Sequence, residues 1–174
     1  MKKCIFVAGI HGVGKTTFSN KLKSKLNIAH YSASQLIRDF NPELFFADKR
    51  VTDIENNQDV LINSIIQNVP EDFYILDGHF TLIKNDNTIE KIPNDTFKKL
   101  GISKTILLLE QPIIINQRIK KRDNNKFLTL DEIDKMQQYE QKHAKEVCDL
   151  YNIQLVTLNS SIDVENYLDK EMLV

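Results

Sequence analysis

The chain has 174 residues, of which 41% are hydrophobic and 27% are charged, and its formal net charge is -1. This size and composition fit one soluble domain over residues 1–174, and the near-neutral charge leaves no strong nucleic-acid signal. No apolar stretch approaches the roughly 20 residues that cross a bilayer, so no membrane partner is expected and the protein is predicted to be cytoplasmic.

The first half of the chain alternates between strand and helix signals. Lys3–Ala8 is a continuous apolar run typical of a strand buried on both faces, and apolar residues recur at helical spacing over Lys15–Leu26. The predicted elements that follow are a second strand (Ile28–Ser32), a helix from Ser34 through Arg38, a helix capped by Asp53 that runs to Val69, and a third strand (Phe73–Leu76).

The second half continues this pattern after a hairpin predicted over Phe80–Ile92, around Asn85-Asp86-Asn87. The later elements are a helical turn (Phe97–Leu100), a strand (Lys104–Leu109), a helix (Pro112 to Lys121), a long helix (Leu130 to about Leu150) with a capping box at Thr129 and Glu132, a strand (Ile153–Thr157) and a helix (Ile162–Leu168). The alternation predicts an α/β fold with a five-stranded parallel sheet and helices on both faces. Ligands of such sheets bind beyond the carboxyl ends of the strands, where Gly9–Thr16, Asp77 and Glu110 lie.

The segment after the first strand reads Gly9-Ile10-His11-Gly12-Val13-Gly14-Lys15-Thr16 and satisfies G-x-x-x-x-G-K-[ST] in full. Its glycines let the backbone turn its N–H groups toward anionic oxygens, and the next helix aims its N-terminus at the same place. The Lys15 ammonium can reach the β- and γ-phosphates, and the Thr16 hydroxyl can ligate Mg²⁺. The predicted nucleotide-binding residues, for ATP or alternatively GTP, are Gly9, His11, Gly12, Val13, Gly14, Lys15, Thr16 and Thr17.

His11 in this segment and Thr17 directly after it have open roles, and the whole segment has a simpler alternative. The side chain of His11 is expected to point away while its backbone N–H binds phosphate. Thr17 is either a helix-face residue or a contact to the α-phosphate. The alternative for the segment is a tight strand-to-helix turn that happens to contain Lys-Thr.

An acidic residue is expected near the metal, because a P-loop needs one to orient the water shell of Mg²⁺. Asp77 follows the strand Phe73–Leu76, which should lie beside the first strand, so Thr16 and Asp77 are the predicted metal ligands. Alternatively, Asp77 caps a turn with Gly78. His79 either lines the acceptor site or satisfies hydrogen bonds of its loop.

Arg118 and Arg122 are four residues apart and share one helical face. Planar guanidinium groups bind the equatorial oxygens of a transferring phosphoryl group, so both are predicted to be catalytic, together with Lys15 and Asp77. The alternative is a solvated basic helix end that complements the helix dipole.

Three short segments join the P-loop in resembling a known family. They read Ser32-Ala33-Ser34-Gln35-Leu36-Ile37-Arg38, Asp77-Gly78-His79 and Arg118-Ile119-Lys120-Lys121-Arg122-Asp123. With the P-loop they resemble the adenylate kinase branch of the nucleoside monophosphate kinases, in particular the small archaeal-type and nuclear adenylate kinases. The resemblance implies a three-layer P-loop kinase fold that uses ATP and Mg²⁺. It also implies an acceptor-binding segment at about 32–69, a short lid at about 122–130, and the substrate-binding residues Ser32, Arg38 and His79.

The sequence departs from the long adenylate kinases in ways that leave the acceptor open. The lid, about Asp123 to Leu128, is short and has no cysteine pair for zinc. The Asp77 segment lacks a Phe-Pro-Arg continuation, and an apparent hairpin over Phe80–Pro93 stands in its place.

The leading hypothesis is ATP-dependent phosphoryl transfer to a small-molecule acceptor, a nucleoside monophosphate. One alternative is a kinase with a hydroxyl acceptor, for which Asp77 or His79 would be the base. Another is a regulatory ATPase module that acts on a protein or RNA partner, as in the related nuclear family. For that alternative, the contact patch would be Phe40, Leu44, Phe45 and Phe46, residues that otherwise pack under an acceptor-binding flap.

Overall fold

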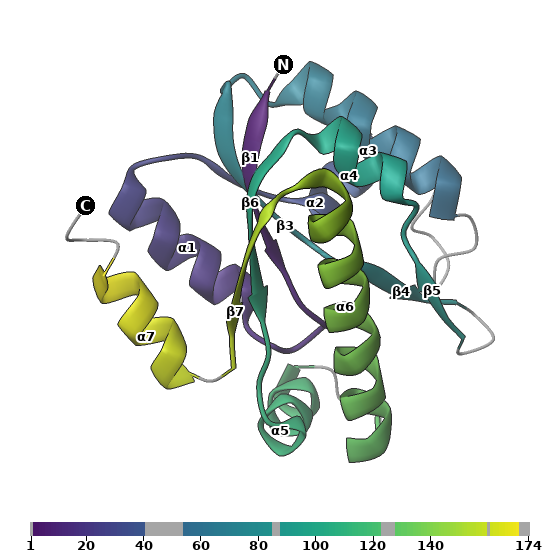
Figure 1. Cartoon of the computed structure of the whole chain (residues 1–174), viewed down its shortest axis with the longest axis vertical. Coiled ribbons are helices and arrows are strands. Elements are labelled where there is room, and N and C mark those ends of the chain that lie inside the picture. Colours follow the sequence, from purple (N-terminus) through teal and green to yellow (C-terminus); the bar gives the residue numbers. More distant parts are fainter. Residues whose placement is uncertain (1, 41–53, 85–87, 123–127, 160, 171–174) are drawn as a thin grey trace.

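The computed structural model describes residues 2–40, 54–84, 88–122, 128–159 and 161–170 (Figure 1). Its centre is a parallel sheet formed by β1 (Lys3–Ala8), β2 (His30–Ser32), β3 (Phe73–Gly78), β6 (Ile102–Leu108) and β7 (Gln154–Leu158). The strand order is β2-β3-β1-β6-β7. The predicted α/β fold with a five-stranded parallel sheet is therefore confirmed.

Helices cover both faces of this sheet, which gives three layers (Figure 1). One face is covered by α1 (Lys15–Leu26) and α7 (Ser161–Lys170), and the other by α2 (Ala33–Phe40), α3 (Ile54–Asn68), α4 (Asn94–Leu100) and α6 (Leu130–Tyr151). The remaining helix, α5 (Pro112–Arg122), packs against the P-loop and α6. Phe6 and Val7, neighbours in β1, belong to opposite apolar clusters, as the alternation of side chains along a strand requires.

β3 is two residues longer than the sequence predicts. Asp77 pairs with Val7 on one side and with Ser32 on the other, and Gly78 pairs with Ala8. Because neighbouring strands offer partners, the strand continues through an Asp-Gly pair that favours a turn locally. Asp77 is thus a buried strand residue, and the alternative that it caps a turn is wrong.

The predicted hairpin is confirmed as β4 (Thr81–Ile83) and β5 (Ile89–Lys91), which pair antiparallel. Its root is fixed to the sheet by aromatic rings. The ring of Phe80 stacks on Phe97 with centroids 4.6 Å apart and meets Phe6 edge-on at 5.3 Å. The residue that follows His79 is therefore held in the core.

The capping box at the start of α6 is also confirmed. The Thr129 side chain accepts a hydrogen bond from the backbone N–H of Glu132, and the Glu132 carboxylate accepts one from the backbone N–H of Thr129.

Both cysteines are buried free thiols, and burial raises the pKa of Cys4 to about 12.

Several sequence predictions lie outside the described residues. They are the cap at Asp53, the patch residues Leu44, Phe45 and Phe46, the turn Asn85-Asp86-Asn87, and the lid residues 123–127. None of the helices in the described ranges is both long enough and apolar enough to span a bilayer.

Candidate active site

The loop between β1 and α1 is packed closely against its neighbours. Gly9, Gly12 and Gly14 have φ angles of 145°, 85° and 111°, which L side chains rarely adopt. A Cβ added to Gly9 would lie 2.7 Å from the carbonyl oxygen of Leu108. One added to Gly12 would lie 2.7 Å from Cγ1 of Ile119. Backbone geometry and the lack of space therefore both require glycine here.

The N-terminus of α1 is open to an anion. Its cap residue, Gly14, makes no side-chain cap, and the first turn carries no acidic residue. The unpaired N–H groups and the helix dipole place partial positive charge at this end. The hydroxyl-bearing Thr16 and Thr17 of the first turn are both exposed. This end therefore provides N–H and hydroxyl groups for a phosphate.

The Lys15 side chain folds back over the loop. Its Nζ donates to the carbonyl oxygens of Gly9 at 2.7 Å and Ile10 at 3.2 Å, and it lies 3.4 Å from Nε2 of His79. Burial lowers the pKa of Lys15 to about 8, while the negative charges of Glu140 and Asp77 act in the opposite direction. A phosphate placed in the loop would compete with the two carbonyls for this ammonium.

His79 is neutral at neutral pH. Burial, followed by the positive charges of Lys15 and His11, holds its pKa well below the ordinary value, and a hydrogen bond to the Gly9 backbone only partly opposes them. In the tautomer that carries its proton on Nδ1, Nε2 accepts from the Lys15 ammonium. His11 is half-buried and lies within electrostatic reach of His79, so three nitrogen-bearing side chains gather at the loop.

Asp77 is bound to a residue that the sequence analysis did not single out. Oδ2 of Asp77 accepts from Nε2 of His30 at 2.7 Å, and both side chains are buried. Nδ1 of His30 lies 3.3 Å from Oδ1 of Asn20 in α1. The pair therefore fixes the Asp77 carboxylate between β2 and α1.

The chemistry of Thr16 and Asp77 fits Mg²⁺. Both supply oxygen, the ligand type that Mg²⁺ prefers. Within the described ranges no group of three or more His, Cys, Asp or Glu side chains could hold a metal. Mg²⁺ at nucleotide sites uses one or two protein oxygens together with phosphates and water, so it needs no such group.

Glu140, in the middle of α6, is fully buried beside this cluster. Its Oε1 accepts from the backbone N–H of Phe80 at 2.8 Å. Its Oε2 accepts from the backbone N–H of Thr81 at 2.8 Å and from the Thr81 hydroxyl at 2.7 Å. Burial raises the pKa of Glu140, and these hydrogen bonds and the Lys15 charge oppose the rise. A carboxylate of α6 thus holds the chain directly after His79.

Arg118 is fixed against the outside of the loop. Its Nη1 donates to the carbonyl oxygen of Val13 at 2.8 Å, and its Nη2 lies 3.4 Å from Oε2 of Glu110. That Glu110 oxygen also accepts from the Ser161 hydroxyl at 2.9 Å. A Cβ on Gly14 would lie 3.6 Å from Nη1 of Arg118, so the guanidinium sits next to the start of α1.

Arg122 and Arg118 differ in their surroundings. Arg122 ends α5 and is exposed, and its positive charge contributes to the lowered pKa of Lys15. The structure therefore places Arg122 within electrostatic reach of Lys15, whereas Arg118 is bound to the loop backbone.

Two of the predicted acceptor residues, Ser32 and Arg38, lie at the end of β2 and in the helix that follows it. Ser32 ends β2 beside Asp77, and its hydroxyl lies 3.1 Å from that of Ser34. Arg38 is exposed on α2, with Nη1 3.5 Å from Oε1 of Gln35. Ser32 therefore borders the cluster, and Arg38 lies farther along α2.

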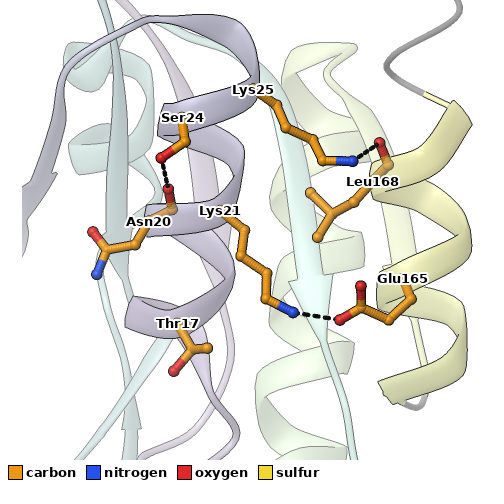
Figure 2. Close-up of a pocket in the computed structure, with 7 residues that line it drawn as sticks. All are labelled: Thr17, Asn20, Lys21, Ser24, Lys25, Glu165 and Leu168. Atoms are coloured by element: carbon orange, nitrogen blue, oxygen red, sulfur yellow. Dashed lines mark hydrogen bonds and ion pairs between the residues drawn. The ribbon is translucent and has the colours of Figure 1, made fainter.

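A separate groove of about 670 Å³ runs along α1 and α7 (Figure 2). It starts at Thr17 and extends to Lys25, away from the loop. Lys21 forms an ion pair with Glu165, and Nζ of Lys25 donates to the carbonyl oxygen of Leu168 at 2.8 Å. These contacts attach α7 to α1, and Thr17 is the predicted site residue that borders the groove.

Comparison with known proteins gives one family match. The model of a family described as AAA domain matches residues 8–137, which include the phosphate-binding loop, Asp77 and Arg118. A comparison with curated protein sequences found no match.

Solved structures with the same architecture include two kinases. Shikimate kinase from Acinetobacter baumannii, in complex with shikimate, has a TM-score of 0.64 at 15% identity, over 98% of this chain and 90% of that chain. A gluconokinase from Sinorhizobium meliloti 1021 has a TM-score of 0.56 at 9% identity, over 99% of this chain and 90% of that chain. At these identities the likeness shows the fold alone, which this chain shares with the two kinases.

Proposed function

The chain belongs to the AAA domain family, and from this premise we propose that it is a kinase that transfers a phosphoryl group from ATP to a nucleoside monophosphate. The observation that carries the proposal is the cluster at Lys15. Its ammonium lies on the phosphate-binding loop beside neutral His79 and within reach of the Arg122 charge. Such a cluster binds anionic oxygens and stabilises the charge that is spread over them during transfer.

The state of the nearby bases favours a phosphate acceptor. A hydroxyl acceptor needs a general base, whereas an acceptor phosphate is already a nucleophile. Asp77 accepts a hydrogen bond from His30, and His79 faces the Lys15 ammonium. The oxygens of Glu140 accept three hydrogen bonds from the chain after His79. The positive charges around the loop suit a second anion.

Most of the predicted site residues have a role in this proposal. Lys15 and the amides of Gly9–Thr16 bind the donor phosphates. Arg118 binds the loop next to Gly14 and contacts the donor nucleotide from there. Arg122 stabilises the transferring group at the start of the lid, about 122–130. Thr16 and Asp77 would hold Mg²⁺, which neutralises charge on the donor phosphates when bound. Ser32 and Arg38, within the acceptor segment at about 32–69, bind the acceptor phosphate.

A small-molecule kinase with a hydroxyl acceptor is the second candidate. One observation favours it: His79 is neutral, and it would be free to accept a proton once Lys15 turned to a phosphate. The fold neighbours, a shikimate kinase and a gluconokinase, are named for hydroxyl acceptors, which is an analogy at the level of the fold.

A coupled assay tests the proposal. Purified protein is incubated with Mg-ATP or Mg-GTP and one acceptor at a time: AMP, CMP, GMP, UMP, dTMP, shikimate or gluconate. We expect ADP formation that depends on one of the monophosphates and is lost in Lys15→Met. Folded protein that binds Mg-ATP but phosphorylates no monophosphate contradicts the proposal.

The other outcomes of this assay are informative. Transfer to shikimate, gluconate or another hydroxyl compound would select the second candidate. ADP formation without any acceptor would select the regulatory ATPase that the sequence analysis left open.

A further inference from the structure

Glu140 is a buried carboxyl group, and the hydrogen bonds that it accepts from the described residues come from one short segment. Its two oxygens accept three hydrogen bonds at 2.7–2.8 Å, from Phe80 and Thr81. A buried carboxylate is costly unless its oxygens are satisfied, and these donors meet that need. The segment they fix begins directly after His79, whose ring lies against Lys15.

A second side chain on the same face of α6 binds the chain that follows β6. Gln137, one turn before Glu140, accepts from the backbone N–H of Glu110 at 2.9 Å and donates to the Glu110 carbonyl oxygen at 2.9 Å. One helix face thus holds the chain after β3 and the chain after β6. Both segments border the phosphate-binding loop through His79 and Arg118.

The geometry points to Glu140 as a positioning residue for phosphoryl transfer: it fixes the segment 79–81 so that His79 stays against Lys15. This inference rests on the proposed function. Glu140 acts through His79 and Lys15 and does not itself contact a substrate.

The first test is Glu140→Gln, which keeps the size of the side chain but turns an NH₂ group toward one of the N–H donors. In the free protein we expect a changed ¹⁵N imidazole spectrum of His79, assigned by comparison with His79→Gln. In the assay, kcat should fall by about tenfold or more, while KM for Mg-ATP changes by less than about threefold.

Three further variants separate positioning from a merely structural role. Glu146→Gln, on the same helix, removes a carboxylate that binds Lys91 and His143 and should leave kcat and the His79 spectrum unchanged. Thr81→Val removes one of the three hydrogen bonds, so it should alter the His79 spectrum and lower kcat less than Glu140→Gln does. Glu140→Asp has a shorter side chain that cannot keep all three hydrogen bonds, so it should change both readouts in the same direction.

Unchanged kcat and an unchanged His79 spectrum in folded Glu140→Gln overturn the inference, as does a loss of stability alone. If Glu140→Gln does not fold, Thr81→Val and Glu140→Asp decide by the same two readouts. If the wild-type protein phosphorylates no acceptor, the proposed function fails. The His79 spectrum of the free protein still shows whether Glu140 holds the segment 79–81 as inferred.

Discussion

Nζ of Lys15 and Nε2 of His79 lie 3.4 Å apart, although the two residues are 64 positions apart in the chain. They meet because β1 and β3 are parallel neighbours, so the segments that follow them leave the same edge of the sheet. The ammonium donates and the neutral imidazole accepts. Nucleotide binding would draw Lys15 toward phosphate, and it is therefore linked to the hydrogen bonding of His79.

Replacing Lys15 by methionine is expected to weaken binding of Mg-ATP by about tenfold to a hundredfold, because a hydrogen bond to a charged group contributes about 1.5–3 kcal/mol. Isothermal calorimetry measures the change. Lys21→Met is the control, since Lys21 lies on the same helix but pairs with Glu165. Equal affinities of Lys15→Met and wild type for Mg-ATP would contradict the predicted role of the loop in nucleotide binding.

Nucleotide affinity is expected to fall as the pH rises through about 8. Burial lowers the pKa of Lys15 from 10.5 to about 8, so the free protein carries the ammonium below that pH and loses it above. Since only the ammonium attracts phosphate strongly, the apparent Kd for Mg-ATP should rise by up to about tenfold per pH unit above 8. Calorimetry from about pH 6.5 to 9.5 tests this, and a flat profile contradicts it.

Asp77→Asn is expected to raise the Mg²⁺ concentration needed for half-maximal activity by about tenfold or more, because Mg²⁺ binds carboxylate oxygens far better than a neutral amide. The Asn side chain can still accept from His30, so the fold should persist. Activity titrated with Mg²⁺ at fixed ATP is the measurement. Asp95→Asn, an exposed change in α4, is the control. An unchanged Mg²⁺ dependence in Asp77→Asn would remove Asp77 from the predicted metal site.

Thr129→Ala is expected to lower the free energy of unfolding by about 0.5–2 kcal/mol, because it removes the side-chain half of the capping box of α6. Urea denaturation at equilibrium gives the difference. Gln141→Ala, on the exposed part of the same helix, should stay within about 0.5 kcal/mol of wild type. A Thr129→Ala curve that overlies the wild-type curve contradicts the cap.

The sheet and the phosphate-binding loop could be predicted because their signals are local. The apolar run Lys3–Ala8, the glycines after it and the helical spacing from Lys15 all lie within one stretch of chain. The end of β3 could not be predicted in this way. Its last two residues are held in the strand by partners in β1 and β2, against their own turn preference.

The residues that surround the loop depend on contacts between distant parts of the chain. His30 reaches Asp77 across 47 positions, and Glu140 reaches Phe80 across 60. A signal for Glu140 does exist in the sequence: Gln137 and Glu140 fall at positions of α6 that continue the buried stripe of Ile133, Ala144 and Val147. Polar residues on an inward helix face require partners, but only the fold identifies them.

The side-chain amide of Gln137 takes the place of a neighbouring strand for Glu110, since it binds both the N–H and the C=O of that residue. The amide proton of Glu110 can therefore exchange with solvent only when α6 lifts from the sheet. Its deuterium uptake would report the opening of the whole helical layer, and the end of β6 and the longest helix should unfold as one cooperative unit.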